Sequence, residues 1–178
     1  MMTIIFDNSK SDITDVIKNT FSKNDENIVF FAAENLNIEP CIGCSSCSGK
    51  TYGHCVIKDD MNKLLSKIVR SNKIILISPI VYGSVSFHIK KVMDKMAVIG
   101  DPRYYIKNGE MVKKMRIPKL EYYMIGFKED LTEEEKLAFI SLHKENIKIM
   151  DVAGKVYAIN NPLDGNAFRK IVKEICYE

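Results

Sequence analysis

The segment that decides the fold is KIILISPIVYG, Lys73 to Gly83. Its unbroken aliphatic run, Ile74 to Ile77, is typical of a strand that is covered on both faces, as in the centre of a parallel sheet. Pro79 has no backbone N–H, so we expect the strand to end at Ser78 and a turn to follow. The segment therefore predicts a central strand that opens directly into a loop.

Strand and helix patterns alternate on both sides of this segment. Further strands are predicted at Met2–Phe6, Asn27–Ala33, Leu120–Ile125 and Val152–Ile159. Helical spacing of apolar residues predicts helices around 13–21, 61–69, 89–96, 131–150 and 164–177. Parallel strands need such crossovers. We expect one α/β domain over residues 1–178, with a doubly wound, five-stranded parallel sheet and helices on both faces.

Two of the helices carry start signals. Asp59 or Asp60 can cap the helix near Met61, and Thr132 with Glu135 has the spacing of a capping box. The stretch 100–118 carries no such signal. It is polar and long for a compact connection, which indicates an irregular insertion that forms a lid or a subunit contact.

Composition excludes several classes of function. A net charge of +3, spread along the chain, gives no case for nucleic-acid binding. No apolar run reaches the length of a membrane span, and the N-terminal residues do not follow the order of a signal peptide. We expect a cytoplasmic protein that does not bind membranes.

Four cysteines fall in one short segment, CIGCSSCSGKTYGHC, with the spacing C-x2-C-x2-C-x7-C. Three thiolates at this local spacing are typical of [4Fe-4S] ligation. The predicted ligands are Cys41, Cys44, Cys47 and Cys55. Structural zinc more often uses two separated pairs, so zinc is the weaker alternative. A reduced, metal-free cysteine loop is a third interpretation, and an odd total of five cysteines argues against a disulfide framework.

The expected sheet suggests where a ligand binds. In open parallel sheets, ligands lie outside the carboxyl ends of the strands. The loops that follow the strands are the one after Phe6, the cysteine loop, the SPIVYG loop and the Gly126 loop. We expect them to share one rim, with metal and ligand as near neighbours.

Three motifs taken together, CIGCSSC, CVIKDDM and ISPIVYGSVSFHIKKVMDK, resemble the iron-sulfur flavoproteins of the NADPH-dependent FMN reductase family. The resemblance covers Ile38 to Lys95. It implies a flavodoxin-like fold with strand order 2-1-3-4-5, bound FMN and a [4Fe-4S] cluster. It also implies homodimers or homotetramers, in which a cluster lies close to the flavin of a neighbouring subunit.

The resemblance also implies roles for individual residues. The isoalloxazine ring would be held by Pro79, Ile80, Val81, Tyr82, Gly83 and Ser84, with Gly126 closing over it. A plain turn between strand and helix is the alternative for this segment. Lys90, Asp94 and Lys95 fall at family positions on the next helix, where Lys95 replaces the usual arginine, although exposed helical charges would explain all three.

The loop after the first strand departs from the family pattern Gly-Ser-Pro-Arg. Ser9, Ser11 and Thr14 offer hydroxyls, and Lys10 offers one cation, to the phosphate of FMN. Asp12 stands at a glycine place, where a carboxylate repels phosphate unless it caps the helix and points away.

The function that the resemblance implies is an FMN-dependent oxidoreductase. Electrons would pass between NAD(P)H or a protein donor, FMN and the cluster, and on to a redox partner protein or a small-molecule acceptor. The cofactors carry this chemistry, so we assign no catalytic side chain. Two alternatives remain: a non-enzymatic flavodoxin-like scaffold, in which zinc or free cysteines support binding of a protein partner, and a flavoprotein without a cluster.

Overall fold

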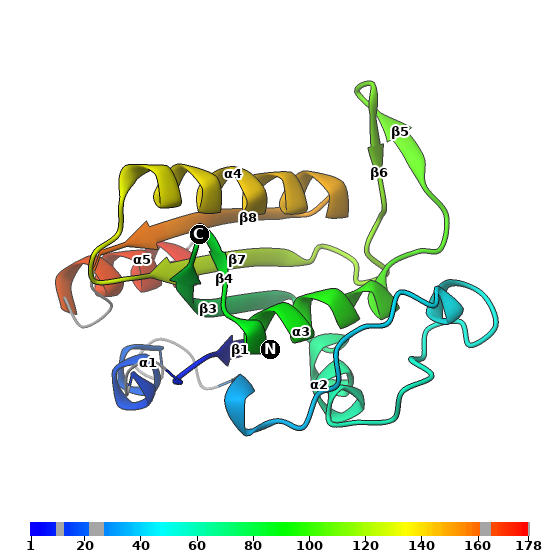
Figure 1. Cartoon of the computed structure of the whole chain (residues 1–178), viewed down its shortest axis with the longest axis horizontal. Coiled ribbons are helices and arrows are strands. Elements are labelled where there is room, and N and C mark those ends of the chain that lie inside the picture. Colours follow the sequence, from blue (N-terminus) through cyan, green and yellow to red (C-terminus); the bar gives the residue numbers. More distant parts are fainter. Residues whose placement is uncertain (10–12, 22–26, 161–164, 178) are drawn as a thin grey trace.

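The computed structural model describes residues 1–9, 13–21, 27–160 and 165–177 (Figure 1). Five parallel strands form the main sheet in the order β2-β1-β3-β7-β8. Their bounds are β1 Met2–Phe6, β2 Ile28–Ala32, β3 Lys73–Val81, β7 Glu121–Phe127 and β8 Ala153–Ile159. The doubly wound sheet and its expected strand order are therefore confirmed.

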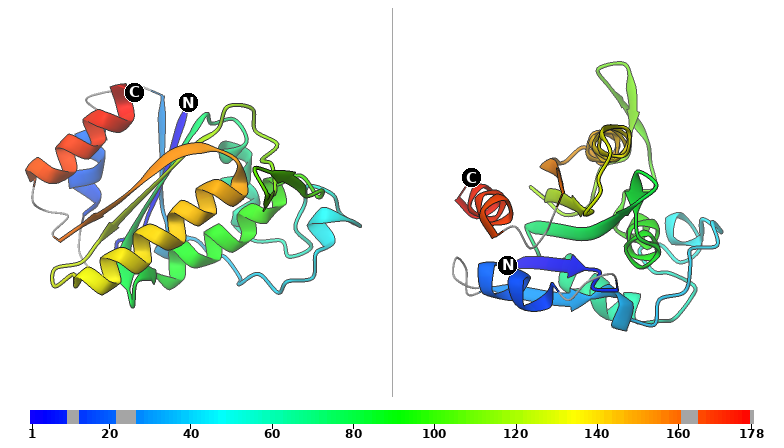
Figure 2. Two further views of the ribbon diagram at one scale, coloured as in Figure 1. Left: turned by 90° about the horizontal axis from the view of Figure 1, so that it is seen from above. Right: turned by 60° about the vertical axis from the view of Figure 1, so that its left-hand side comes forward.

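Helices cover both faces of this sheet, as Figure 2 shows. One face is covered by α1 Thr14–Phe21 and α5 Gly165–Tyr177, and the other by α2 Met61–Ile68, α3 Phe87–Lys95 and α4 Glu133–Met150. Successive side chains of a strand point to opposite faces. On β7, Tyr122 and Met124 accordingly enter the core beneath α2, α3 and α4, and Tyr123 and Ile125 enter the core beneath α1 and α5.

Strand β3 does not end at Ser78, and that prediction was wrong. It runs through Pro79 to Val81, with Pro79 opposite Phe127 of β7. The ladder between β1 and β3 stops at the pair Phe6 and Ile77, so the proline lies beyond the end of β1. A proline is tolerated in a strand where one side lacks a neighbouring strand. The chain then turns back as β4, Ser84–Val85, antiparallel to β3.

The stretch 100–118 was predicted to be irregular, but it contains a β-hairpin. β5 Tyr105–Lys107 and β6 Glu110–Val112 are antiparallel, and the hairpin projects from the body of the domain (Figure 1). Asn108 and Gly109 between them have φ of 51° and 81°. An Asn-Gly pair with two positive φ angles is the favoured two-residue hairpin turn.

Of the two predicted helix caps, the one at α4 has the expected hydrogen bonds and the one at α2 differs. The capping box of Thr132 and Glu135 is present at α4. At α2 the N-cap residue is Asp60, whose side chain makes no cap bond, and Asp59 Oδ1 instead accepts a hydrogen bond from Met61 N. The described ranges also contain three short 3-10 turns, η1 Ala33–Asn35, η2 Ser46–Ser48 and η3 Met96–Ile99. Among the described residues, no helix combines the length and apolar character needed to cross a bilayer.

Candidate functional site

The cysteine segment between β2 and α2 wraps one small pocket. All four predicted ligands line this pocket, and its other walls come from the segment itself and from the end of α3 with η3: Ile42, Ser45, Val56, Ile57, Asp94, Lys95, Ala97 and Val98. Cys41 and Cys44 are exposed, while Cys47 and Cys55 are half-buried and pack against the core. The structure thus brings together the four thiols that the sequence singled out. Cys176, by contrast, packs against the core beneath α1 and α5.

The backbone around Cys44 curves tightly. Gly43 and Ser45 both have positive φ, 66° and 56°, and η2 follows at once. Ser46 donates hydrogen bonds from its hydroxyl and its amide to the sulfur of Cys44, and these lower the pKa of that thiol. A lowered pKa favours the thiolate, which is the form that binds metals.

The donor set suits a soft metal centre in chemistry and in number. As placed here, however, no three Cys, His, Asp or Glu side chains of the described residues stand close enough to hold one metal ion. In a [4Fe-4S] cluster each thiolate binds a different iron, so this spacing argues against a single ion such as zinc and not against a cluster.

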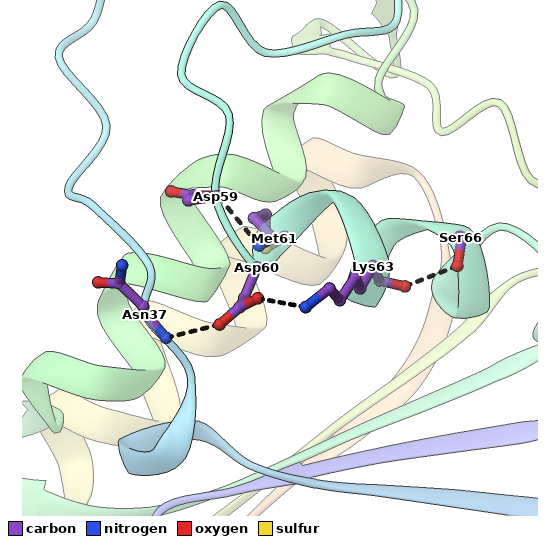
Figure 3. A network of polar contacts seen from close by, with 6 residues as sticks. All are labelled: Asn37, Asp59, Asp60, Met61, Lys63 and Ser66. Carbon is purple, nitrogen blue, oxygen red and sulfur yellow. Dashed lines mark hydrogen bonds and ion pairs between the residues drawn. The ribbon is translucent and has the colours of Figure 1, made fainter.

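Two aspartates close the base of the cysteine segment (Figure 3). Asp60 Oδ2 accepts from Asn37 N at 3.0 Å, and Asp60 N donates to Asn37 O at 3.1 Å. Asp59 Oδ2 accepts from Glu39 N at 2.9 Å, and Asp59 Oδ1 accepts from Met61 N at 3.0 Å. These bonds join residues 37–39, where the chain enters the cysteine segment, to residues 59–60, where it leaves. The two ends of the loop are therefore held together outside its first and last cysteines.

Lys95 anchors this base to α3. Its Nζ forms an ion pair with Asp59 Oδ2, and the two side chains are only 0% and 3% exposed. Lys95 also lines the cysteine pocket. An exposed helical charge was one explanation for Lys90, Asp94 and Lys95; it holds for the pair Lys90 and Asp94, but not for Lys95. No sequence pattern indicates the pairing of Lys95 with Asp59.

The turn between β3 and β4 carries the predicted ring contacts. Pro79 and Ile80 are buried in the strand, Val81 and Ser84 are half-buried, and Tyr82 is 95% exposed with φ of 49°. Gly83 has φ of 73°, and a Cβ there would lie 2.9 Å from Ala138 Cβ of α4. The turn is thus packed against α4 and presents a free aromatic face at the carboxyl edge of the sheet. This arrangement suits stacking on a flat aromatic ligand.

The loop after β1 fits a phosphate less well. Asn8 N donates to Glu34 Oε2 at 3.1 Å, Ser9 N to Asp7 Oδ1 at 2.8 Å, and Ile13 N to Asn8 Oδ1 at 2.7 Å. These backbone amides are already bonded to side-chain oxygens of the same chain. Thr14 begins α1, and Lys10, Ser11 and Asp12 lie outside the described residues. Among the described residues, the Tyr82 turn thus offers a stacking face, whereas the amides of Asn8, Ser9 and Ile13 are already occupied.

Gly126 was expected in the loop after a strand, but it lies within β7, which continues to Phe127. A Cβ at Gly126 would lie 2.5 Å from the ring of Phe139 and 2.8 Å from Ile80. The absence of a side chain lets α4 pack closely on the sheet.

The prediction that all these loops share one rim was wrong for the cysteine loop. The chain leaves β2 at the carboxyl edge and runs back toward the C-terminal end of α3 (Figures 1 and 2). The cysteine pocket is accordingly lined by Asp94 and Lys95 at that end of the helix. The Tyr82 turn precedes the N-terminal end of that helix. Nine helical residues at 1.5 Å each separate the two by roughly 13 Å.

The strand order and the helices on both faces of the parallel sheet define a flavodoxin-like α/β protein. A family model described as NADPH-dependent FMN reductase matches residues 7–115, and the chain belongs to this family. The family predicted from the motifs is thus confirmed.

Solved structures show the same fold over the whole chain. An FMN-dependent NADH-azoreductase from Bacillus anthracis, solved in complex with FMN, superposes with a TM-score of 0.65 at 11% identity, covering 99% of this chain and 98% of that one. A flavodoxin from the domain Archaea superposes with a TM-score of 0.55 at 13% identity, covering 99% and 97%. At these identities the likeness concerns the fold alone.

Curated relatives are similar over a shorter stretch. An iron-sulfur flavoprotein of Methanocaldococcus jannaschii is 39% identical over 66 residues, which are 37% of this chain and 33% of that protein. Another, from Methanosarcina thermophila, is 27% identical over 74 residues, 42% of this chain and 38% of that protein. The matched stretches span about a third of the length of these relatives.

Proposed function

We propose that this protein is an oxidoreductase that transfers electrons through a flavin and a [4Fe-4S] cluster held by Cys41, Cys44, Cys47 and Cys55. The observation that carries the proposal is the single pocket lined by all four thiols. Membership of the FMN reductase family and the similarity to proteins named iron-sulfur flavoproteins support it.

The four thiols would be the ligands of the cluster, and a cluster so held accepts and releases single electrons. The chain itself supplies three other things at this site. Ser46 favours the thiolate form of Cys44, the aspartates fix the base of the loop, and the ion pair of Lys95 with Asp59 joins that base to the pocket wall at the end of α3.

The turn from Pro79 to Ser84 would hold the flavin ring, with Tyr82 as the stacking surface. The phosphate-binding roles predicted for Ser9, Lys10, Ser11 and Thr14, and the contact predicted for Gly126, stay predictions. NAD(P)H remains the proposed donor, and a redox partner protein or a small molecule the proposed acceptor. No side chain is assigned a proton-transfer role.

The separation of the thiol pocket from the Tyr82 turn along α3 is a reason to propose an oligomer. Within one chain the thiol pocket and the Tyr82 turn lie at opposite ends of that helix. A homodimer or homotetramer that sets one chain's pocket beside another chain's turn would shorten the path, and we include such an assembly in the proposal. We also propose a cytoplasmic location, where reducing conditions keep thiols available for a cluster.

One anaerobic purification tests the proposal by measuring iron, acid-labile sulfide, zinc, flavin and the visible spectrum. We expect about four iron and four sulfide per chain, as a [4Fe-4S] centre requires, and loss of both in Cys44→Ser. The matched control is Cys176→Ser, whose cysteine lies in the other core. Equal iron in wild type and Cys44→Ser would refute the ligand assignment.

The second candidate is a scaffold that binds a protein partner and uses zinc or free thiols for stability. The backbone amides after β1 favour this candidate, because they already donate to side-chain oxygens of the same chain and this weakens the case for a flavin nucleotide. Zinc without flavin or visible colour in the same purification would support this candidate. Flavin bands without iron would indicate the third possibility, a flavoprotein that lacks a cluster.

A further inference from the structure

The start of the loop between β1 and α1 is bonded to a carboxylate from a neighbouring strand connection. Glu34 lies in η1, directly after β2, and its Oε2 accepts a hydrogen bond from Asn8 N at 3.1 Å. Because β1 and β2 are adjacent and parallel, both connections begin at the same edge of the sheet. The contact is partly buried and joins residues 26 positions apart.

A second acidic side chain, that of Asp7, bonds to the next amide of this loop. Asp7 is fully buried; its Oδ1 accepts from Ser9 N, and its Oδ2 has no hydrogen-bond partner among the described residues. Two acidic side chains thus adjoin the amides of Asn8 and Ser9. A phosphate bound at Asn8 N would have to replace the bond to Glu34, and the Glu34 carboxylate would repel it.

Flavin nucleotides in flavodoxin-like folds bind at the edge beside β1 and β3, with phosphate favoured where free amides open a helix. In this chain the side chain of Tyr82 is exposed, whereas the described amides after β1 already donate hydrogen bonds to side-chain oxygens. We propose that Glu34 is a specificity-determining residue: its carboxylate occupies Asn8 N and repels a phosphate bound beside it, so that this chain discriminates less between FMN and riboflavin than it would without Glu34.

This inference rests on the proposed flavin function, and one set of titrations separates the two. Riboflavin and FMN, which differ only in the phosphate, are titrated into the full chain, and binding is followed by flavin fluorescence. The variants are Glu34→Ala, which removes both charge and acceptor, and Glu34→Gln, which removes only the charge. Glu39→Ala is the matched control, because its exposed side chain lies on the same connection.

Wild type should bind riboflavin and FMN with dissociation constants within about threefold of each other. Glu34→Ala should tighten FMN about tenfold and leave riboflavin unchanged, Glu34→Gln should give a smaller gain, and Glu39→Ala should change neither ligand. An unfolding temperature for each variant verifies the fold; if Glu34→Ala is not folded, Glu34→Gln decides alone.

Wild type that binds FMN 100-fold tighter than riboflavin, with no gain in either Glu34 variant, would overturn the inference and leave the proposed function standing. An equal gain for both flavins would also overturn it, because Glu34 would then act on the ring end. If no variant binds either flavin, the flavin part of the proposed function fails, and the inference fails with it.

Discussion

Replacing Lys95 by methionine should destabilise the domain strongly, although lysine is a residue usually found on the surface. The substitution keeps most of the side-chain length but leaves the Asp59 carboxylate, 3% exposed, without its cation. Removing one partner of a buried ion pair costs about 3–5 kcal/mol. Two backbone amides still donate to Asp59, so we expect about 3 kcal/mol. At about 2–4 °C per kcal/mol for a domain of this size, the unfolding temperature should fall by roughly 6–12 °C.

Urea unfolding and thermal melts of the metal-free, reduced protein measure this loss. Lys90→Met is the control on the same helix, since Lys90 and Asp94 form an exposed pair whose loss should cost at most about 0.5 kcal/mol. The double variant Lys95→Met with Asp59→Asn should recover about 1 kcal/mol or more, because it removes the unpaired charge. Thiol labelling adds a local measure: Lys95→Met should expose Cys47 and Cys55 faster than Lys90→Met does.

A Lys95→Met protein within about 1 kcal/mol of wild type would refute this reasoning, since the ion pair could not then hold the segment on α3. Equal destabilisation by Lys90→Met and Lys95→Met would refute it as well, because burial would then make no difference.

Three further predictions concern the scaffold. Burial lowers the pKa of His143 to about 4 from 6.5, so below pH 6.5 the unfolded chain binds a proton at this residue that the folded chain does not bind. The free energy of unfolding should therefore fall by about 2 kcal/mol between pH 7 and pH 5 in urea titrations, and by much less in His143→Gln. Gly126→Ala should cost about 1–3 kcal/mol, because the new methyl group meets the ring of Phe139; an unchanged melting temperature would contradict the packing role. Thr132→Ala should cost about 1 kcal/mol by removing the cap of α4, and Thr132→Ser, which keeps the hydroxyl, should cost far less.

Local patterns predicted the frame of the molecule well. Period-two and period-3.6 patterns are short-range properties, so they located the five parallel strands and the helices, and the capping box was visible as Thr132 and Glu135. The hairpin could also have been predicted, since Asn108-Gly109 is a strong turn signal between two short runs. The strand through Pro79 could not, because it depends on where β1 ends.

The parts of the site that escaped prediction all depend on tertiary placement. Lys90 and Lys95 look alike along a helix, and only the position of Asp59, 36 residues away, buries one of them. Spacing predicted that the four thiols meet in one pocket, but loop length does not fix the direction in which a loop runs. The position of that pocket at the far end of α3 therefore came only from the fold.

The projecting hairpin makes one part of this domain sensitive to ionic strength. An isolated two-stranded ribbon is marginal in water, and β5 and β6 are held to the C-terminal end of α4 by Tyr105 and Lys107 on Asp151 and by Glu110 on Lys148. Added salt screens such exposed contacts, so amide exchange over residues 105–112 should accelerate with salt while the sheet stays protected. Lys113 Nζ donates to Ser48 Oγ, next to Cys47. The residue that follows the hairpin is thus hydrogen-bonded to the thiol-bearing segment.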